Sequence, residues 1–203
     1  MKIIAVGRNY SEHAKELGNQ IPDKPVLFLK PDTAVLKNNK PFYHPSFSED
    51  IHFEVEVLLK ICKEGKSIEE KFANKYYDEI GLGIDFTARD LQSAQKAKGL
   101  PWEIAKAFDN SAVVSEFISI NNFKDINHLQ FNLFVNEELK QNGNTAEMLN
   151  SFDKLISYAS KFFTLKKGDI IFTGTPEGVG KINVGDRLKG NLGKHELLNF
   201  EIK

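Results

Sequence analysis

The sequence predicts one domain that combines many strands with a few short helices. Apolar runs such as residues 2–7 and 25–30 have the length of buried strands and are bounded by Gly or Pro. The segments 87–98 and 152–163 instead carry the spacing and end signals of helices. With 203 residues, 41% of them apolar and 16 of them Phe, the chain can fill a sizeable core. We therefore expect a single domain over residues 1–203, with two small domains as the alternative.

Charge and cysteine content narrow the class of function. The chain has 27 basic and 28 acidic residues, so neither nucleic acid nor an anionic membrane is an expected partner. The single Cys62 excludes an intrachain disulfide, and the sequence has no signal-peptide pattern and no apolar run of about 18 residues. The motifs GxSxG, HExxH and GxGxxG are also absent. We expect a cytoplasmic protein that acts on small molecules.

An acidic pair, Glu54 and Glu56, stands on a predicted strand in the stretch EDIHFEVEVLLKI. Residues two apart on a strand project from the same face, so these carboxylates are expected to lie side by side. Two carboxylates at that distance repel, and a hard divalent cation such as Mg²⁺ or Mn²⁺ relieves the repulsion. The pair alone leaves a second interpretation open, a solvated acidic face of a half-exposed strand.

A third carboxylate, Asp85, falls where the predicted strand IGLGIDF meets the helix that Gly99 ends. Arg89 and Gln92 follow on one face of that helix. A carboxylate, a guanidinium group and a carboxamide would then point into one space, which suits a metal-bound carboxylate substrate. The alternative is an acidic helix start that forms an ion pair with Arg89 four residues later.

A short helix is predicted between Ser11 and Gly18, and it is too short to be stable alone. It is therefore a candidate lid. His13 and Glu16 are three residues apart on it, so the carboxylate can orient the imidazole and raise its basicity. Two charged residues on an exposed helix are the alternative interpretation.

Three further predictions concern the rest of the chain. Ser67 and Glu70 have the spacing of a capping box, and a hairpin turn is expected near NGN at 142–144. Ser151 is expected to start a helix. Its predicted core stripe consists of Leu155, Tyr158, Ala159 and Phe162.

Six motifs occur in a recognisable order: GRNYSEHAKELGN, PVLFLKPDTAV, HFEVEVLL, GIDFTARDLQ, KGLPWEIAKAFD and GDIIFTGTPEGVG. In this order they resemble the fumarylacetoacetate hydrolase family, and within it the small single-domain branch of acylpyruvate hydrolases and oxaloacetate decarboxylases. The resemblance runs from about residue 3 to the C-terminus. It implies an α+β fold, in which a large rolled, mostly antiparallel mixed β-sheet carries short helices, and it implies a homodimer.

The resemblance also implies roles for single residues. Glu54, Glu56 and Asp85 are the expected ligands of one Mg²⁺ or Mn²⁺ per subunit. His13, Glu16 and Lys106 are the expected catalytic residues. The expected substrate-binding residues are Arg89, Gln92, Lys106, Gly174 and Thr175.

The implied substrate is a small 2-oxo acid. The expected reaction hydrolyses the C–C bond of an acylpyruvate to give pyruvate and a carboxylic acid, and decarboxylation of oxaloacetate is a further expected activity. Two alternatives stay open: an isomerase or hydratase of dienoate 2-oxo acids, and a catalytically silent protein that binds a metal or an oxo acid.

Overall fold

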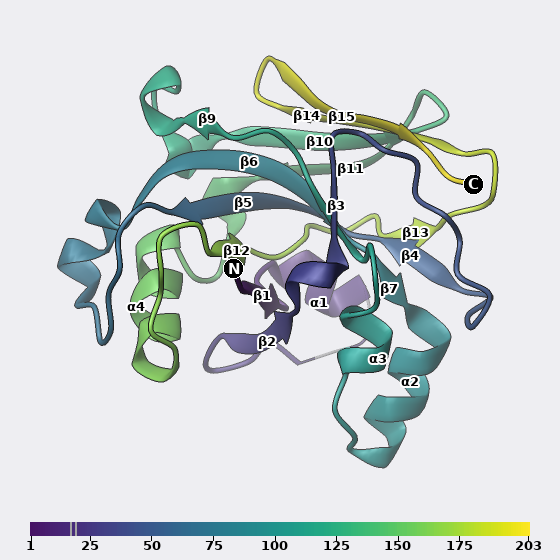
Figure 1. The fold of residues 1–203 in the computed structure, drawn as a ribbon, viewed down its shortest axis with the longest axis horizontal. Coiled ribbons are helices and arrows are strands. Elements are labelled where there is room, and N and C mark those ends of the chain that lie inside the picture. Colours follow the sequence, from purple (N-terminus) through teal and green to yellow (C-terminus); the bar gives the residue numbers. More distant parts are fainter. Residues whose placement is uncertain (17, 19) are drawn as a thin grey trace.

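The computed structural model describes residues 1–16, 18 and 20–203. Its largest sheet contains β1 (Ile3–Gly7), β2 (Val26–Lys30), β3 (Val35–Lys37), β5 (Val55–Ile61), β6 (Tyr77–Asp85), β8 (Ala112–Val114), β9 (Ile118–Ser119) and β12 (Ile170–Phe172). The strand order is β2-β1-β12-β5-β6-β8-β3, and β9 joins β6. β1 pairs with β12 and β3 with β8 in parallel, whereas the other pairs are antiparallel. The long strands β5 and β6 curl through the molecule (Figure 1).

A second, antiparallel sheet lies against the first. It has the order β11-β10-β14-β15, formed by β10 (Gln130–Val135), β11 (Glu138–Asn144), β14 (Arg187–Leu192) and β15 (His195–Glu201). A small third sheet joins β4 (Ile51–Phe53) to β7 (Thr87–Ala88) and β13 (Gly180–Lys181). The predicted α+β class, with a rolled and mostly antiparallel mixed sheet, is confirmed.

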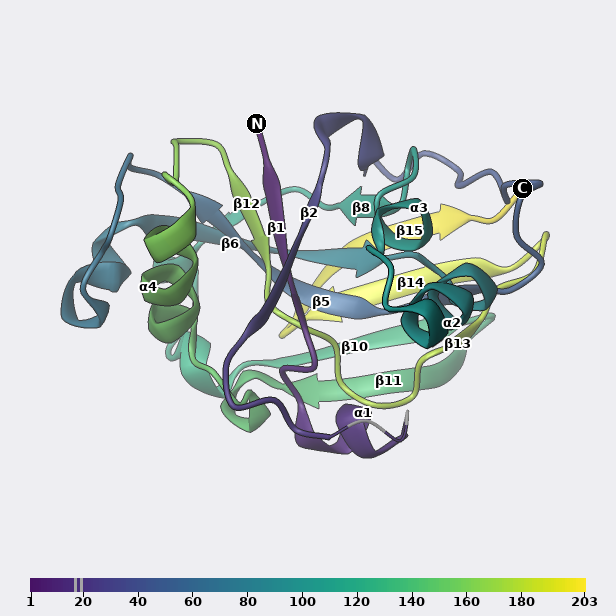
Figure 2. The ribbon, with the colours of Figure 1, turned by 90° about the horizontal axis from the view of Figure 1, so that it is seen from below.

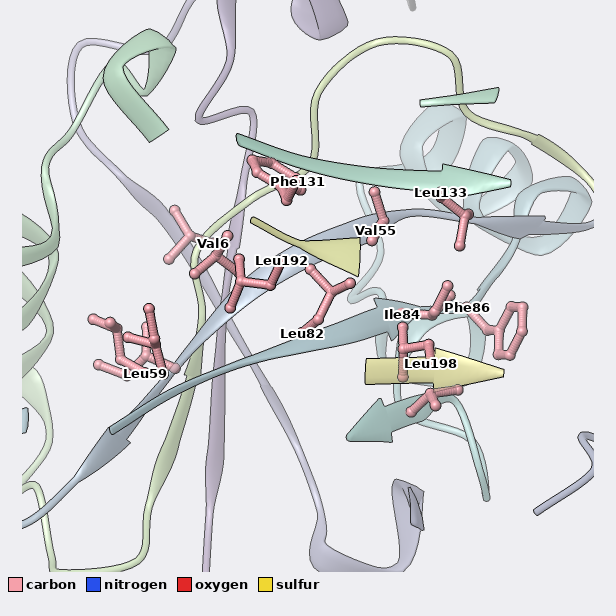
Figure 3. Close-up of a cluster of buried hydrophobic side chains, with 14 of the residues drawn as sticks. Val6, Val55, Leu59, Leu82, Ile84, Phe86, Phe131, Leu133, Leu192 and Leu198 are labelled. Carbon is pink, nitrogen blue, oxygen red and sulfur yellow. The ribbon is translucent and has the colours of Figure 1, made fainter. Parts of the chain in front are cut away.

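The core fills the space between the two larger sheets (Figure 3). Leu59 of β5 and Leu82 of β6 belong to the same buried cluster as Phe131 of β10 and Leu192 of β14, and all four side chains have 0% exposure. Full burial of one such side chain contributes about 1.5–3 kcal/mol. The two strands that carry the acidic residues are therefore held firmly on their core side.

The α-helices are short and lie around the sheets: α1 (Ser11–Glu16), α2 (Arg89–Lys98), α3 (Glu103–Lys106) and α4 (Phe152–Phe162). The 3₁₀ segments are η1 (Asp32–Ala34), η2 (Glu70–Lys75), η3 (Ile120–Asn122), η4 (Ile126–His128) and η5 (Thr145–Glu147). α2 and α3 lie side by side, with α1 near the turn that leaves β1 (Figure 2). In the described part of the chain, no helix is long and apolar enough to cross a membrane.

The predicted helix ends agree largely with the structure. Gly99 ends α2 with φ 64°, a left-handed conformation that glycine adopts without steric cost. Ser151 caps α4, because its hydroxyl accepts the backbone N–H of Lys154 at 3.3 Å. Ser11 is the first residue of α1 and not its cap, and Gly18 follows the helix with φ 64°.

Two local predictions are wrong. The β10–β11 hairpin turns at Asn136 and Glu137, with φ 51° and 67°, and residues 142–144 lie inside β11. Gly143 serves packing there, since a Cβ would come 2.7 Å from the Phe131 ring. Ser67 has φ 51° and caps nothing, because η2 begins at Glu70 without a side-chain cap.

The stripe on α4 is only partly correct. Leu155 and Ala159 are buried, but Phe162 is 57% exposed. Phe152 and Ile156 are buried instead, so the buried stripe begins about one turn closer to the start of the helix.

Candidate active site

The three carboxylates lie where β4, β5 and β6 meet. Glu54 stands between β4 and β5, at the point where the chain passes from the small sheet into the large one. Asp85 ends β6, and its backbone N–H donates to the Glu54 carbonyl at 2.9 Å. Glu54, Glu56 and Asp85 each offer an oxygen within 4.8 Å of the other two, and all three residues are at most 5% exposed. The solvated acidic face is therefore ruled out.

Three cations surround these carboxylates. Arg89 donates to Glu54 Oε1 at 2.6 Å, and Lys106 donates to Glu54 Oε2 and to Asp85 Oδ2, each at 2.7 Å. The buried Lys30 ammonium lies 2.6 Å from Asp85 Oδ1 and donates to the Ser111 carbonyl at 3.0 Å. Arg89 thus pairs with a residue from another strand, and the predicted alternative of a local pair with Asp85 is not what the structure shows.

Burial and charge act differently on the two glutamates. Burial alone would raise the pKa of Glu54, but the charges of Lys106 and Arg89 outweigh it and lower that pKa well below its ordinary value. The pKa of Glu56 is raised, first by burial and then by the charge of Asp85. Lys106 has a raised pKa, because Asp85 and Glu54 outweigh its burial. Among the residues that the structure describes, Glu56 is therefore the one carboxylate of the triad Glu54, Glu56 and Asp85 without an ion-pair partner.

The turn after β12 completes this side of the site. The Gly174 N–H donates to Glu56 Oε2 at 2.7 Å, so the predicted substrate-binding Gly174 contacts a carboxylate of the triad. Thr175 is buried and lines the same pocket as the triad. Its hydroxyl oxygen accepts from Gln141 Nε2 at 2.8 Å, which leaves the hydroxyl proton free to donate to a ligand.

His13 and Glu16 meet on α1, as their spacing predicts. His13 Nδ1 lies 3.2 Å from Glu16 Oε2, and His13 is 5% exposed and lines the pocket. Glu16 Oε1 also accepts the Gly178 backbone N–H at 3.0 Å, so the dyad is tied to the glycine-rich turn. Because Glu16 engages Nδ1, Nε2 is the ring nitrogen left for proton transfer.

The donor set fits a divalent cation. Three buried carboxylates converge, and Asp85 Oδ1, which lies 2.6 Å from the Lys30 ammonium, has no partner with hydrogen-bond geometry among the described residues. An all-oxygen set of this kind suits Mg²⁺ or Mn²⁺ better than Zn²⁺. Glu54, Glu56 and Asp85 are the residues that could hold such an ion.

Sequence reasoning missed several residues that support the site. Lys30, 1% exposed, contacts Asp85, and Gln141, 1% exposed, accepts the Val55 N–H and holds Thr175. A lysine that closes an apolar strand just before a proline was the only signal for Lys30. Arg8 and Lys96 also line the pocket; Arg8 lies in the motif GRNYSEHAKELGN without an assigned role, and Lys96 lies outside the six motifs.

Comparison with known proteins agrees with this geometry. The family described as fumarylacetoacetate (FAA) hydrolase C-terminal matches residues 2–200. This chain belongs to the fumarylacetoacetate hydrolase family. "Oxaloacetate decarboxylase, mitochondrial" of Dictyostelium discoideum is 44% identical over 99% of this chain and 93% of that protein. "Oxaloacetate tautomerase YcgM" of Escherichia coli (strain K12) is 43% identical over 97% of this chain and 90% of that protein.

A solved member of the fumarylacetoacetate hydrolase family has the same fold. Fumarylpyruvate hydrolase from Pseudomonas aeruginosa, in complex with Mn²⁺ and pyruvate, superimposes with a TM-score of 0.93 at 34% identity. The match covers 100% of this chain and 89% of that one. The relatives are thus enzymes of one family that differ in reaction.

Proposed function

We propose that this chain is a divalent-metal-dependent enzyme for small 2-oxo acids that works through an enolate. The observation that carries the proposal is the buried triad of Glu54, Glu56 and Asp85, with the His13–Glu16 dyad facing the same pocket. Relatives named for oxaloacetate and a neighbour that holds Mn²⁺ and pyruvate support this class of substrate. Oxaloacetate and acylpyruvates are the substrates proposed here.

The pocket side chains hold the head group of the acid. A divalent cation bound by the triad would polarise the keto oxygen and stabilise developing negative charge. Lys106 and Arg89 supply positive charge for the substrate carboxylate, and Gln92 keeps Nε2 as a donor because its Oε1 accepts from Arg89 at 2.8 Å. The Thr175 hydroxyl, which also lines the pocket, can donate to the same head group.

His13 moves the proton. With an acylpyruvate, Nε2 takes a proton from water, the oxygen of which adds to the distal carbonyl. The C–C bond then breaks, one fragment leaves as a carboxylic acid, and the other is the enolate of pyruvate, which takes up a proton. With oxaloacetate, the same imidazole can move a proton between C3 and the keto oxygen, which is a tautomerisation, and loss of CO₂ yields the same enolate.

One set of assays separates the activities. We expect pyruvate release from acetylpyruvate and conversion of oxaloacetate, both lost in EDTA and restored by Mg²⁺ or Mn²⁺. A dienoate 2-oxo acid run beside them tests the isomerase alternative. Binding of pyruvate without turnover of any of these acids would identify a silent binding protein and refute the enzymatic proposal.

A homodimer is part of the proposal. An apolar groove next to α3 is lined by Leu29, Phe47 and Ile104, which are 38%, 50% and 62% exposed. α3 presents Ile104 to this groove and Lys106 to the carboxylates, so an interface here would also support the site. Light scattering should give the mass of two chains for the parent and of one for Ile104→Lys. The control Val184→Lys, at a 68% exposed position outside the groove, should stay dimeric.

A further inference from the structure

Two cations of the pocket have no role in the site described above. Arg8 and Lys96 both line the pocket of the triad and are half-buried. Neither side chain forms a hydrogen bond or ion pair with any residue that the structure describes. Two carboxylates of the pocket already have cation partners, because Arg89 and Lys106 pair with Glu54 and Lys30 pairs with Asp85.

The backbone holds Arg8 in place at some cost. Arg8 follows β1 directly, with φ 60°, a left-handed conformation that is uncommon for a residue with a side chain. Such conformations cluster at ligand sites, where the surrounding structure enforces them. The conformation lets β1 turn into α1, so the guanidinium group lines the pocket beside the element that carries His13.

Lys96 reaches the pocket from α2. It follows Arg89 and Gln92 at helical spacing on α2, so the three side chains share one face. Its ammonium lies 5.3 Å from the centre of the Trp102 ring, and Trp102 packs edge-on against Phe28. Burial and the charges of Arg89, Arg8 and Lys106 lower the pKa of Lys96 to about 8, and only the more distant Glu54 counteracts them.

The charge balance indicates what would bind there. Counted at their formal charges, the three carboxylates balance Lys30, Arg89 and Lys106, so these six side chains have no net charge. A divalent cation adds two positive charges, and Arg8 and Lys96 add two more. A substrate with one carboxylate offsets one of these four charges in a partly desolvated pocket, and a second carboxylate near Arg8 and Lys96 offsets another.

We propose that Arg8 and Lys96 form a subsite for the distal carboxylate of the substrate, so that the pocket prefers dianionic 2-oxo acids over monoanionic ones. The inference rests on the proposed function and specifies its substrate class. The Trp102 ring supports the Lys96 stem, and the head group stays with the triad and Lys106. The two cations thus bind the distal carboxylate of the same substrate molecule.

Direct binding tests the subsite without turnover. Malate and 2-hydroxybutanoate carry the same 2-hydroxycarboxylate head group and differ only in a distal carboxylate or methyl group. Calorimetric titration of the Mg²⁺-loaded protein should show malate binding about tenfold more tightly, the lower end of what a charge-assisted hydrogen bond supplies. Lys96→Gln and Arg8→Gln should each lower this ratio severalfold, and the double variant should abolish it.

The control is Lys98→Gln, which removes an exposed lysine from the same helix and should keep the parent ratio. Thermal unfolding of each variant verifies that it is folded. Equal affinities of the parent for the two acids, or an unchanged ratio in both pocket variants, would overturn the subsite. If neither acid binds and pyruvate does not bind either, the proposed function itself fails, and the subsite with it.

Discussion

Replacement of Glu56 by Gln tests whether Glu56 is a metal ligand or a carboxylate with a purely structural role. The amide is nearly isosteric, and its oxygen can still accept the Gly174 N–H that now lies 2.7 Å from Glu56 Oε2. At an effective dielectric constant of about 20, two carboxylate oxygens at most 4.8 Å apart repel by at least about 3 kcal/mol. Loss of one charge from the triad removes such repulsion, so the metal-free variant should be at least as stable as the metal-free parent.

The response to metal should be the opposite. A cation at one hundred times its Kd stabilises the parent by about 2.7 kcal/mol. For a chain of 203 residues this corresponds to a rise in Tm of about 5–10 °C. Glu56→Gln should shift by less than about 2 °C under the same conditions, because one of three ligand charges is gone.

Scanning calorimetry with Mg²⁺ and with EDTA measures both effects. The matched control is Glu79→Gln, which removes the same charge from β6 where Glu79 pairs with Lys60 at 2.5 Å near the surface. This control should keep the full Mg²⁺ shift of the parent. A full shift in Glu56→Gln would show that Glu56 is not a ligand, and no shift in the parent would remove the metal from the triad altogether.

Three further predictions follow from the same geometry. His13→Ala should lower the rate of acylpyruvate cleavage by a factor of about 10²–10⁴ and the rate of oxaloacetate decarboxylation much less, since only cleavage needs an activated water. Equal losses of both rates would show that His13 and Glu16 act by closing α1 over the substrate. Gly174→Ala should cost about 1–3 kcal/mol of unfolding free energy, because φ is 101° and a Cβ would lie 2.6 Å from Asn9 Cβ. Gly185 has φ 98° and no atom within 4 Å of an added Cβ, so Gly185→Ala measures the cost of the backbone conformation alone. Equal urea midpoints of the two variants would refute a contribution from the clash with Asn9. The pKa of Lys96 is about 8 in the folded protein against an ordinary 10.5, so the unfolded chain binds this proton more tightly. The charged Lys96 therefore lowers the free energy of unfolding fully below pH 8, and this destabilisation disappears between pH 8 and pH 10.5. Lys96→Gln should therefore be more stable than the parent at pH 7, by about 1 kcal/mol after solvent screening, and equal to it at pH 11; the same difference at both pH values would refute this.

The sequence predicted correctly those features of the fold and the site that depend on residues close together in the chain. The alternation around Glu54 and Glu56, the glycine after α2 and the three-residue spacing of His13 and Glu16 all involve positions close in the chain. The hairpin was misplaced because Asn136 and Glu137 adopt left-handed conformations without a glycine, whereas the Asn-Gly pair that signals a turn lies inside β11.

Contacts between distant residues carried no such signal. Lys30 of β2 meets Asp85 of β6 although β1, β12 and β5 lie between these strands in the order of the large sheet, and Gln141 meets Thr175 across 34 residues of sequence. Arg89 faces two acidic candidates, and only the turn through β7 decides that it pairs with Glu54 and not with Asp85. Spacing alone could not decide this, since Phe86 and the two residues of β7 lie between Asp85 and the helix.

The placement of the site explains how one fold can serve several reactions. The triad stands at the junction of β4 with β5 and at the end of β6, and the core holds both long strands, so its geometry is common to any substrate. His13 and Arg8 instead sit on a six-residue helix and on the turn before it, and Lys96 lies in the last turn of α2. Changes in these peripheral elements can alter the base or the distal contact while the triad stays in place. The relatives are named as a decarboxylase, a tautomerase and a hydrolase, and this variety of reactions fits a division between a fixed triad and variable surrounding elements.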